Sequence, residues 1–130
     1  VSQVSRATLY NHYRDKDSVL LALCESELAR LVEMAQNAPD ATSALEQISL
    51  QVSSDPALAA MRVQDPDQLA LALTKHDDHL WKAFAIAMTH LLGEGKSALA
   101  LRWLLGQALH PISAQQSRAH AEAITGLANL

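Results

Sequence analysis

The side chains with the most evident chemistry cluster in the first sixteen residues. Arg6, Arg14 and Lys16 stand there against a single acid, Asp15, whereas residues 17–130 carry seven basic and thirteen acidic side chains. The segment is therefore net +2 and the remainder net −6. A small basic end permits a local contact with phosphate, while an acidic remainder discourages nonspecific contact with nucleic acid. Three basic residues in sixteen also arise by chance, so charge alone leaves both interpretations open.

A second cluster of polar side chains lies at residues 76–79. His76 and His79 have the i, i+3 spacing of one helix face, with Asp77 and Asp78 beside them, which can begin a metal site. No third ligand is evident in the sequence, and a solvated polar patch or a helix kink is the simpler interpretation. The sequence also contains no Gly-rich phosphate loop, nucleophile elbow or HExxH motif. We therefore expect neither an enzyme nor a bound metal or cofactor.

The composition predicts the kind of fold that positions these residues. In 130 residues, 49% are hydrophobic and 18% charged, which suffices for one domain with a core. Ala and Leu dominate while β-branched and aromatic residues are scarce, which favours an all-α fold. The single cysteine, Cys24, excludes an internal disulfide and is expected to be an inert core residue. With no secretory signal and no apolar run of about 18 residues, we expect a cytoplasmic protein without membrane contact.

Helix signals recur along the chain. Ser5 and Asp15 can cap helices, the second with an apolar stripe that runs to about Asn37. Asp40 or Thr42 begins the next, with apolar positions 45, 48 and 52 inward. Asp-Pro pairs at 55–56 and 65–66 begin two more, and the second opens a stretch to residue 92 with a break near 76. The glycines at 93 and 95 predict a stop, residues 97–109 a further helix, and Ser113 the cap of a last helix to about residue 128.

The helix predicted at residues 97–109 is apolar nearly all round, so it must be covered on all sides. The last helix offers small residues that permit close approach. Two such helices from each of two chains would form a four-helix bundle, although a core within one chain explains the pattern equally well. The interface candidates are Leu101, Leu105, Ala121, Ile124 and Leu127.

The first sixteen residues also carry a specific motif. Ser5, Thr8, Leu9, Tyr10, His12 and Lys16, with Tyr13 as an aromatic in the usual place of Phe, follow the pattern Ser-x-x-Thr-Leu-Tyr-x-His-Phe-x-x-Lys. The segment resembles the recognition helix and following helix start of TetR/AcrR-type bacterial transcription regulators. That resemblance implies a TetR-like division, with residues 1–14 as the C-terminal part of a helix-turn-helix DNA-binding domain. Residues 15–130 are then a helical ligand-binding and dimerisation domain, and the chain begins inside the helix-turn-helix.

The residue types suit a helix in the major groove of double-stranded DNA. Arg6 can grip guanine with two hydrogen bonds and Thr8 can touch a thymine methyl. Lys16, in the first turn of a helix, can hold a phosphate together with free backbone N–H groups. The DNA-contact candidates, several of which donate to phosphate oxygens, are Ser5, Arg6, Thr8, Tyr10, Asn11, His12 and Lys16. Each of them, taken singly, is equally well a solvated surface side chain.

The resemblance further implies a small-molecule pocket in the helical body. Such a pocket should be mostly apolar with a few polar groups. The candidates, each of which can equally be core, are Met61, Leu73, His76, Trp81, Phe84, Met88 and Trp103. The helix of residues 15–37 is the expected switch element, because its start adjoins the DNA motif and a ligand beside Cys24 or Leu28 would tilt it.

These observations predict a homodimeric, DNA-binding transcription regulator, in which a small-molecule effector releases a repressor from a palindromic operator. The alternative is a helical interaction or adaptor domain whose degenerate helix-turn-helix no longer binds DNA. A salt-dependent interaction with a palindromic fragment distinguishes the two.

Overall fold

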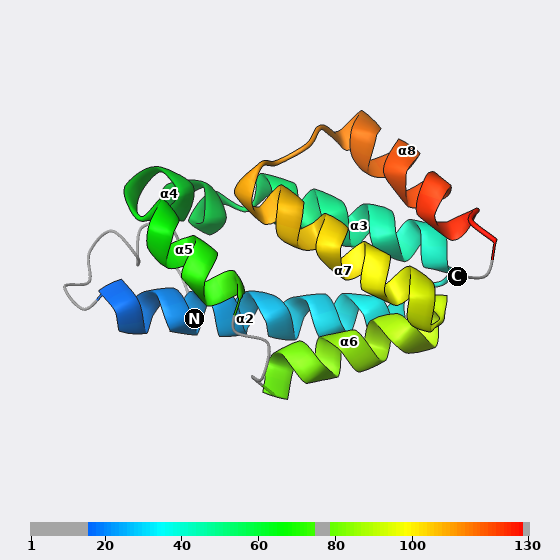
Figure 1. Ribbon diagram of the computed structural model, residues 1–130, viewed down its shortest axis with the longest axis horizontal. Coiled ribbons are helices and arrows are strands. Elements are labelled where there is room, and N and C mark those ends of the chain that lie inside the picture. The colour runs from blue at the N-terminus through cyan, green and yellow to red at the C-terminus, as the bar shows by residue number, and fades with distance from the viewer. Residues whose placement is uncertain (1–15, 75–78, 129–130) are drawn as a thin grey trace.

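The computed structural model describes residues 16–74 and 79–128, and helices account for most of them (Figure 1). They are α2 (Lys16–Asn37), α3 (Ala41–Ser54), α4 (Pro56–Gln64), α5 (Pro66–Leu73), α6 (His79–Leu92), α7 (Glu94–Leu109) and α8 (Ala114–Thr125). The described residues contain no β-strand, which confirms the expected all-α class. Nor does any helix in this part of the chain combine the length and apolar character needed to traverse a bilayer.

Three of the predicted helix caps form. Asp40, rather than Thr42, caps α3, because its carboxylate accepts from the backbone N–H of Ser43 at 2.8 Å. The hydrogen bonds from Ser43 also hold the pKa of Asp40 below its usual value. Asp55 accepts from the N–H of Ala57 at 2.8 Å, directly before the proline that begins α4. Ser113 forms a capping box at the start of α8.

The turn before α7 is shorter than the glycine pattern predicts. Only Gly93 lies between α6 and α7, with a φ of 88° that favours glycine. Gly95 continues the helix, so α7 begins at Glu94, three residues before the predicted start at Ser97. The predicted stretch from residue 66 to residue 92 forms two helices, α5 and α6, as the expected break implies.

Four helices form a ring around the main core. α2 contacts α3, α3 contacts α7, α7 contacts α6, and α6 contacts α2. Figure 1 shows that α2 and α6 run in one direction while α3 and α7 run in the other. α8 packs on the outer side of α3, and α5 contacts α2 and α7 near one end of the ring. Figure 1 shows that the start of α2 extends beyond α6, to the end of the molecule where α4 and α5 lie.

The core consists of the apolar stripes of these helices. Leu45, Ile48 and Val52 of α3 are all buried, which confirms their predicted inward orientation. Fully burying a side chain of this size stabilises the fold by about 1.5–3 kcal/mol. The stripe of α2 contributes Leu23, Leu28, Leu31 and Ala35, with Cys24 half-buried at its edge.

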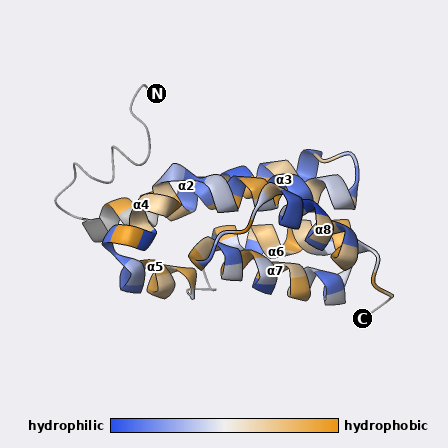
Figure 2. Cartoon of the chain, turned by 90° about the horizontal axis from the view of Figure 1, so that it is seen from above, coloured by the Kyte–Doolittle hydropathy of each residue, from blue (hydrophilic) through white to orange (hydrophobic). Residues whose placement is uncertain are grey.

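Apolar residues also remain on the outer surface. Figure 2 shows hydrophobic positions among hydrophilic ones along α5 and α7. On α7, the helix that is apolar nearly all round, Ala100, Leu104 and Ala108 are buried, whereas Leu99 and Leu109 are exposed. The chain therefore covers one side of this helix and leaves another in contact with solvent.

Candidate functional site

The predicted DNA contacts Ser5, Arg6, Thr8, Tyr10, Asn11 and His12 lie outside the described residues. So do the predicted pocket residue His76 and the two aspartates of the possible metal cluster. Lys16 is the first residue of α2, but its side chain is likewise outside the description. The predicted pocket residues Leu73, Trp81 and Phe84 do lie among the described residues, at a pocket in the helical body.

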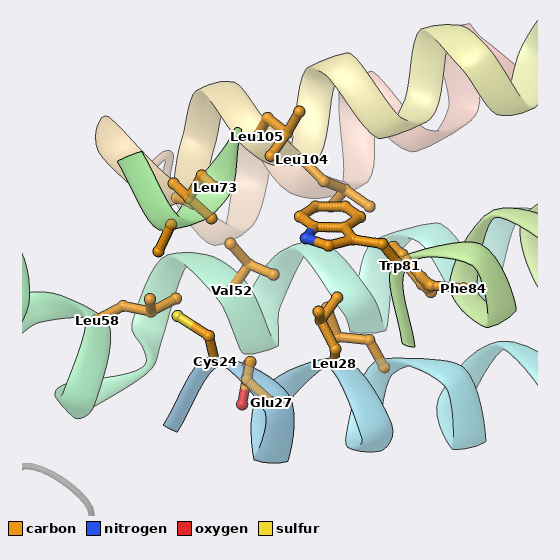
Figure 3. A pocket seen from close by; sticks show the side chains of 13 residues that line it. Cys24, Glu27, Leu28, Val52, Leu58, Leu73, Trp81, Phe84, Leu104 and Leu105 are labelled. Carbon is orange, nitrogen blue, oxygen red and sulfur yellow. The ribbon is translucent and has the colours of Figure 1, made fainter. Parts of the chain in front are cut away.

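The pocket is a small, partly enclosed cavity of about 60 Å³ that is lined by residues of α2, α3, α4, α5, α6 and α7 (Figure 3). Its position follows from the fold, because α5 closes the end of the ring that α2, α3, α6 and α7 form. Thirteen residues line it: Cys24, Glu27, Leu28, Leu31, Val52, Leu58, Ala72, Leu73, Trp81, Phe84, Leu104, Leu105 and Ala108.

Part of the predicted pocket set lies at this cavity. Leu73, Trp81 and Phe84 line it, as do Cys24 and Leu28, beside which a ligand was expected to act. Met61 and Met88 are instead buried in the core and are absent from the described lining. The half-buried Trp103 turns toward α8, where its indole N–H donates to His120 Nδ1 at 3.1 Å.

The sequence-based set missed the acidic residue of the lining, Glu27. A carboxylate within the apolar stripe of α2 was the available signal, since it follows Cys24 by three residues and precedes Leu28. Glu27 is only 6% exposed, and the amide of Gln51 donates to its two oxygens at 3.3 and 3.4 Å. The pocket therefore joins an apolar wall to a carboxylate that is largely withdrawn from water.

The electrostatics of the pocket are visible in the thiol of Cys24. Its pKa is raised from an ordinary 9.0 to about 11, mainly by burial and also by the charges of Glu27, Glu25 and Asp55. The group is a protonated thiol at neutral pH and hence a poor nucleophile. Within residues 16–74 and 79–128, no group of three His, Cys, Asp or Glu side chains is placed to hold a metal ion.

A positive charge lies near one edge of this region. Arg62 donates from Nε to the backbone oxygen of Ala108 at 2.6 Å, and the charge of Asp55 supports its protonated form. Burial nevertheless lowers the pKa of Arg62 from its usual value. Because Arg62 is not among the lining residues, its contribution is to fix α4 against the end of α7.

The junction of α3, α7 and α8 is held by polar side chains, in contrast to the mainly apolar pocket. Ser49 donates to Gln107 Oε1 at 2.7 Å, Ser53 donates to the same oxygen at 2.7 Å, and the hydroxyls of Ser49 and Ser117 are 2.7 Å apart. We call these four residues the polar junction. Ser49, Gln107 and Ser117 are each at most 2% exposed. Buried hydrogen bonds of this kind specify one packing of three helices, because leaving any member unpaired is costly.

The predicted interface residues lie in different surroundings. Ala121 and Ile124 are buried within the chain, on the face of α8 that also carries Ser117. Leu105 lines the pocket, and Leu101 is half-buried. Leu127 is 40% exposed. Because α8 lies on α3, Ala121 and Ile124 are not available to a second chain in this arrangement.

No protein-family model, curated protein or solved structure matches the chain.

Proposed function

We propose that the chain is a DNA-binding transcription regulator of the TetR type, a repressor that a small, mainly apolar effector releases from a palindromic operator. The proposal rests on the motif at Ser5, Thr8, Tyr10, His12 and Lys16, which suits a recognition helix followed by a phosphate-binding helix start. The overall acidic charge restricts DNA contact to that end.

The single observation that carries the regulatory part is the position of α2. This helix begins at Lys16, within the motif, and four of its residues line the pocket about two to four turns later: Cys24, Glu27, Leu28 and Leu31. One rigid element thus adjoins both the proposed DNA contact and the proposed effector site. A ligand that displaces α2 at Leu28 also displaces its start at Lys16.

The size of the pocket supports this coupling. A volume of about 60 Å³ is far below the roughly 300–1,000 Å³ typical of small-molecule sites. An effector can therefore enter only if the surrounding helices move apart, and binding then favours the expanded state. Because recognition helices must lie roughly 34–36 Å apart to reach successive major grooves, a shift of a few ångströms loses one half-site. Effector and operator must consequently weaken each other's binding by the same factor.

Dimerisation is the third part of the proposal. The surfaces that remain available to a second chain include the exposed Leu99 on α7 and Leu127 after α8. Leu99 and Leu127, rather than Ala121 and Ile124, are therefore the first residues to substitute in a test of dimerisation. Light scattering of the purified chain distinguishes a dimer from a monomer.

The decisive experiment is a mobility shift of a palindromic fragment from the protein's own promoter, with the complete protein, at several salt concentrations. Lys16→Ala should weaken binding to all sequences alike and lower the salt slope by about one unit. Arg6→Ala should instead relax sequence preference, at a cost of about 1–3 kcal/mol. Lys82→Ala, which removes an exposed charge on α6, is the matched control and should leave both quantities unchanged.

An unchanged salt slope for Lys16→Ala would contradict its phosphate role. Absence of any salt-dependent shift for the unaltered protein would reject DNA binding and favour a helical interaction domain.

A further inference from the structure

The last helix, α8, is held on the fold mainly by polar contacts. Of its 12 residues, only Ser117, Ala121 and Ile124 are buried, and Ile124 is the only large apolar side chain among them. Burying one side chain of that size contributes about 1.5–3 kcal/mol, whereas α3 buries three of them. The position of α8 therefore depends on specific hydrogen bonds and ion pairs as much as on apolar burial.

The contacts between α8 and α3 extend from the first turn of α8 to its last residue. They join Ser117 to Ser49 at 2.7 Å, Arg118 to Glu46 at 2.9 Å and Thr125 to Thr42 at 2.8 Å. α3 thus presents a hydroxyl, a carboxylate and a second hydroxyl to a hydroxyl, a guanidinium and a hydroxyl of α8. This complementarity fixes the register of α8 and makes the outer surface of α3 a specific binding site for it.

α7 completes this binding site. Lys96 Nζ donates to the backbone oxygen of Thr125 at 3.0 Å, at the C-terminal end of α8, where the macrodipole favours a positive charge. The indole N–H of Trp103 donates to His120 Nδ1 at 3.1 Å. α8 nevertheless contacts α3 more extensively than α7, although α7 precedes it in the chain. We call the surface formed by Thr42, Glu46, Ser49, Lys96 and Trp103 the α8 site.

Residues 110–113 connect α7 to α8 and form a short, extended hinge. The backbone is extended at His110, with φ −132° and ψ 90°, and at Ser113, with φ −75° and ψ 164°. Figure 1 shows the hinge drawn out between the end of α7 and the start of α8. Such a hinge has little slack with which to return a helix to its own chain, and this condition favours exchange of the helix between two copies.

We propose that two copies of the chain associate by exchanging α8, so that each α8 occupies the α8 site of the other copy. This inference rests on the dimer of the proposed regulator and specifies how that dimer forms. The occupant of the site is a second copy of the same helix, because that helix carries the hydroxyl, guanidinium and imidazole groups that the site matches. The exchange is reciprocal, so the dimer has two-fold symmetry.

Exchange preserves the contacts of α8 and relieves the hinge. Each contact at the α8 site keeps the same pair of residues, now in different chains. The hydrogen bond from the Ile112 N–H to Ser53 Oγ at 3.1 Å belongs to the hinge and is given up. In return, the two hinges meet at the two-fold axis, where the exposed Leu109 of each copy becomes covered. Ala121 and Ile124, which are buried within one chain in the structure, lie between two chains after exchange.

The test places a disulfide across the α8 site. The hydroxyl oxygens of Thr42 and Thr125 are 2.8 Å apart, so cysteines at the two positions are within reach of a disulfide. Thr42→Cys/Thr125→Cys is prepared from the full chain in a Cys24→Ala background, purified without unfolding, and oxidised. Exchange should give a covalent dimer on a non-reducing gel, whereas a chain that retains its own α8 gives a covalent monomer.

Mixtures of single-cysteine variants check this result without a double substitution. Thr42→Cys and Thr125→Cys are unfolded together in urea, refolded and oxidised, and the linked peptides are identified by mass spectrometry. Exchange should link position 42 of one chain to position 125 of the other in about half of the dimers, the share that random pairing gives. Ala119→Cys, at an exposed position on α8, replaces Thr125→Cys in the control mixture and should form no such link.

A hinge variant measures how much the short connection contributes. A Gly-Ser insertion between His110 and Pro111 gives α8 the slack to stay on its own chain. It should weaken dimerisation, measured by light scattering over a dilution series, by about tenfold or more. The same insertion between Ala38 and Pro39, in the connection from α2 to α3, is the control and should leave the dimer unchanged. Equal dimer affinity in the two variants would count against exchange, since a dimer held by the exposed Leu99 does not depend on the hinge.

The outcomes separate exchange from dimerisation and from DNA binding. A covalent monomer, from a protein that light scattering shows to be dimeric, overturns exchange and assigns the dimer to another surface. A monomeric protein overturns both exchange and the dimer of the proposed regulator. Neither result bears on the DNA contact, because the salt-dependent shift of the palindromic fragment measures it independently.

Discussion

The pocket and the polar junction lie side by side along the buried face of α7, at Leu104 and Ala108 and at Gln107, and they pack the helices in different ways. At the junction, hydroxyl and amide groups of Ser49, Gln107 and Ser117 are held at 2.7 Å, so each position depends on its partners. At the pocket, apolar side chains meet around unfilled space without directional bonds. Hydrogen-bonded groups resist displacement because separation leaves them unpaired, whereas apolar contacts can be re-formed with a ligand. We therefore expect the helices to resist separation at the junction and to move apart more readily at the pocket.

The largest effect is expected from Ser49→Ala. The change removes one of the two donors to Gln107 Oε1, leaving Ser53 as the other, and deprives the fully buried Ser117 hydroxyl of its bond to Ser49. We expect a loss of about 2 kcal/mol in the free energy of unfolding, measured by urea denaturation. Ser54→Ala, an exposed serine of the same helix whose hydroxyl donates to the Leu50 carbonyl, should cost less than about 0.5 kcal/mol. Equal losses for the two variants would show that the junction is no firmer than the surface.

A smaller effect is expected from the pH dependence of the pocket. The folded state keeps the Cys24 thiol protonated up to about pH 11, whereas the unfolded chain ionises it above its ordinary pKa of 9.0. The unfolded state therefore binds fewer protons in this window, and the free energy of unfolding falls as the pH rises from 9 to 11. After allowance for partial exposure, the loss due to Cys24 should be about 1–2 kcal/mol.

The measurement is the difference between the unaltered chain and Cys24→Ala, by urea denaturation at pH 8 and pH 10.5. The subtraction removes the contribution that other groups titrating at high pH make to the free energy of unfolding. The same slope in both proteins would mean that the thiol does not experience the burial and the carboxylate charges described for the pocket.

The smallest change in stability is expected when one methyl group is added to the lining of the pocket. Val52→Ile adds it to the pocket lining and should stabilise the fold by no more than about 1 kcal/mol. Ser117→Thr adds the same methyl group to the fully buried junction and should destabilise the fold by about 1 kcal/mol or more. Thermal unfolding of both variants checks the contrast, and a destabilised Val52→Ile would show that the pocket has no room to spare.

Local features of this fold were predictable because their causes are local. Asp40, Asp55 and Ser113 each precede a helix by the spacing that a capping side chain needs, and each forms its cap. The start of α7 could not be predicted in this way, because two glycines two residues apart are typical of a loop. Of the two, only Gly93 takes a positive φ. Glu94 begins the helix, where the macrodipole stabilises a negative side chain.

The site was less predictable because it depends on contacts across the chain. Trp81 and Phe84 were natural candidates as bulky residues, but Met61 and Met88 looked the same and are core. Glu27 was overlooked because a charge in a stripe is ordinarily read as solvated. The junction between Ser49 and Ser117 spans 68 positions. Nothing in the small residues of α8 indicates that its partner is α3 rather than a second copy of the chain.

The one-residue connection at Gly93 restricts how α6 can move relative to α7. Fourteen residues give this helix a length of roughly 21 Å, with Gly93 at one end and Trp81 near the other. Because a single residue cannot let α6 slide far along α7, displacement of α6 has to be rotation about that glycine. A rotation of about 10° would move the Trp81 end by roughly 3–4 Å and the Gly93 end hardly at all. A ligand that binds beside Trp81 therefore acts at the end of α6 farthest from Gly93, where a small rotation produces the largest separation of α6 from α2.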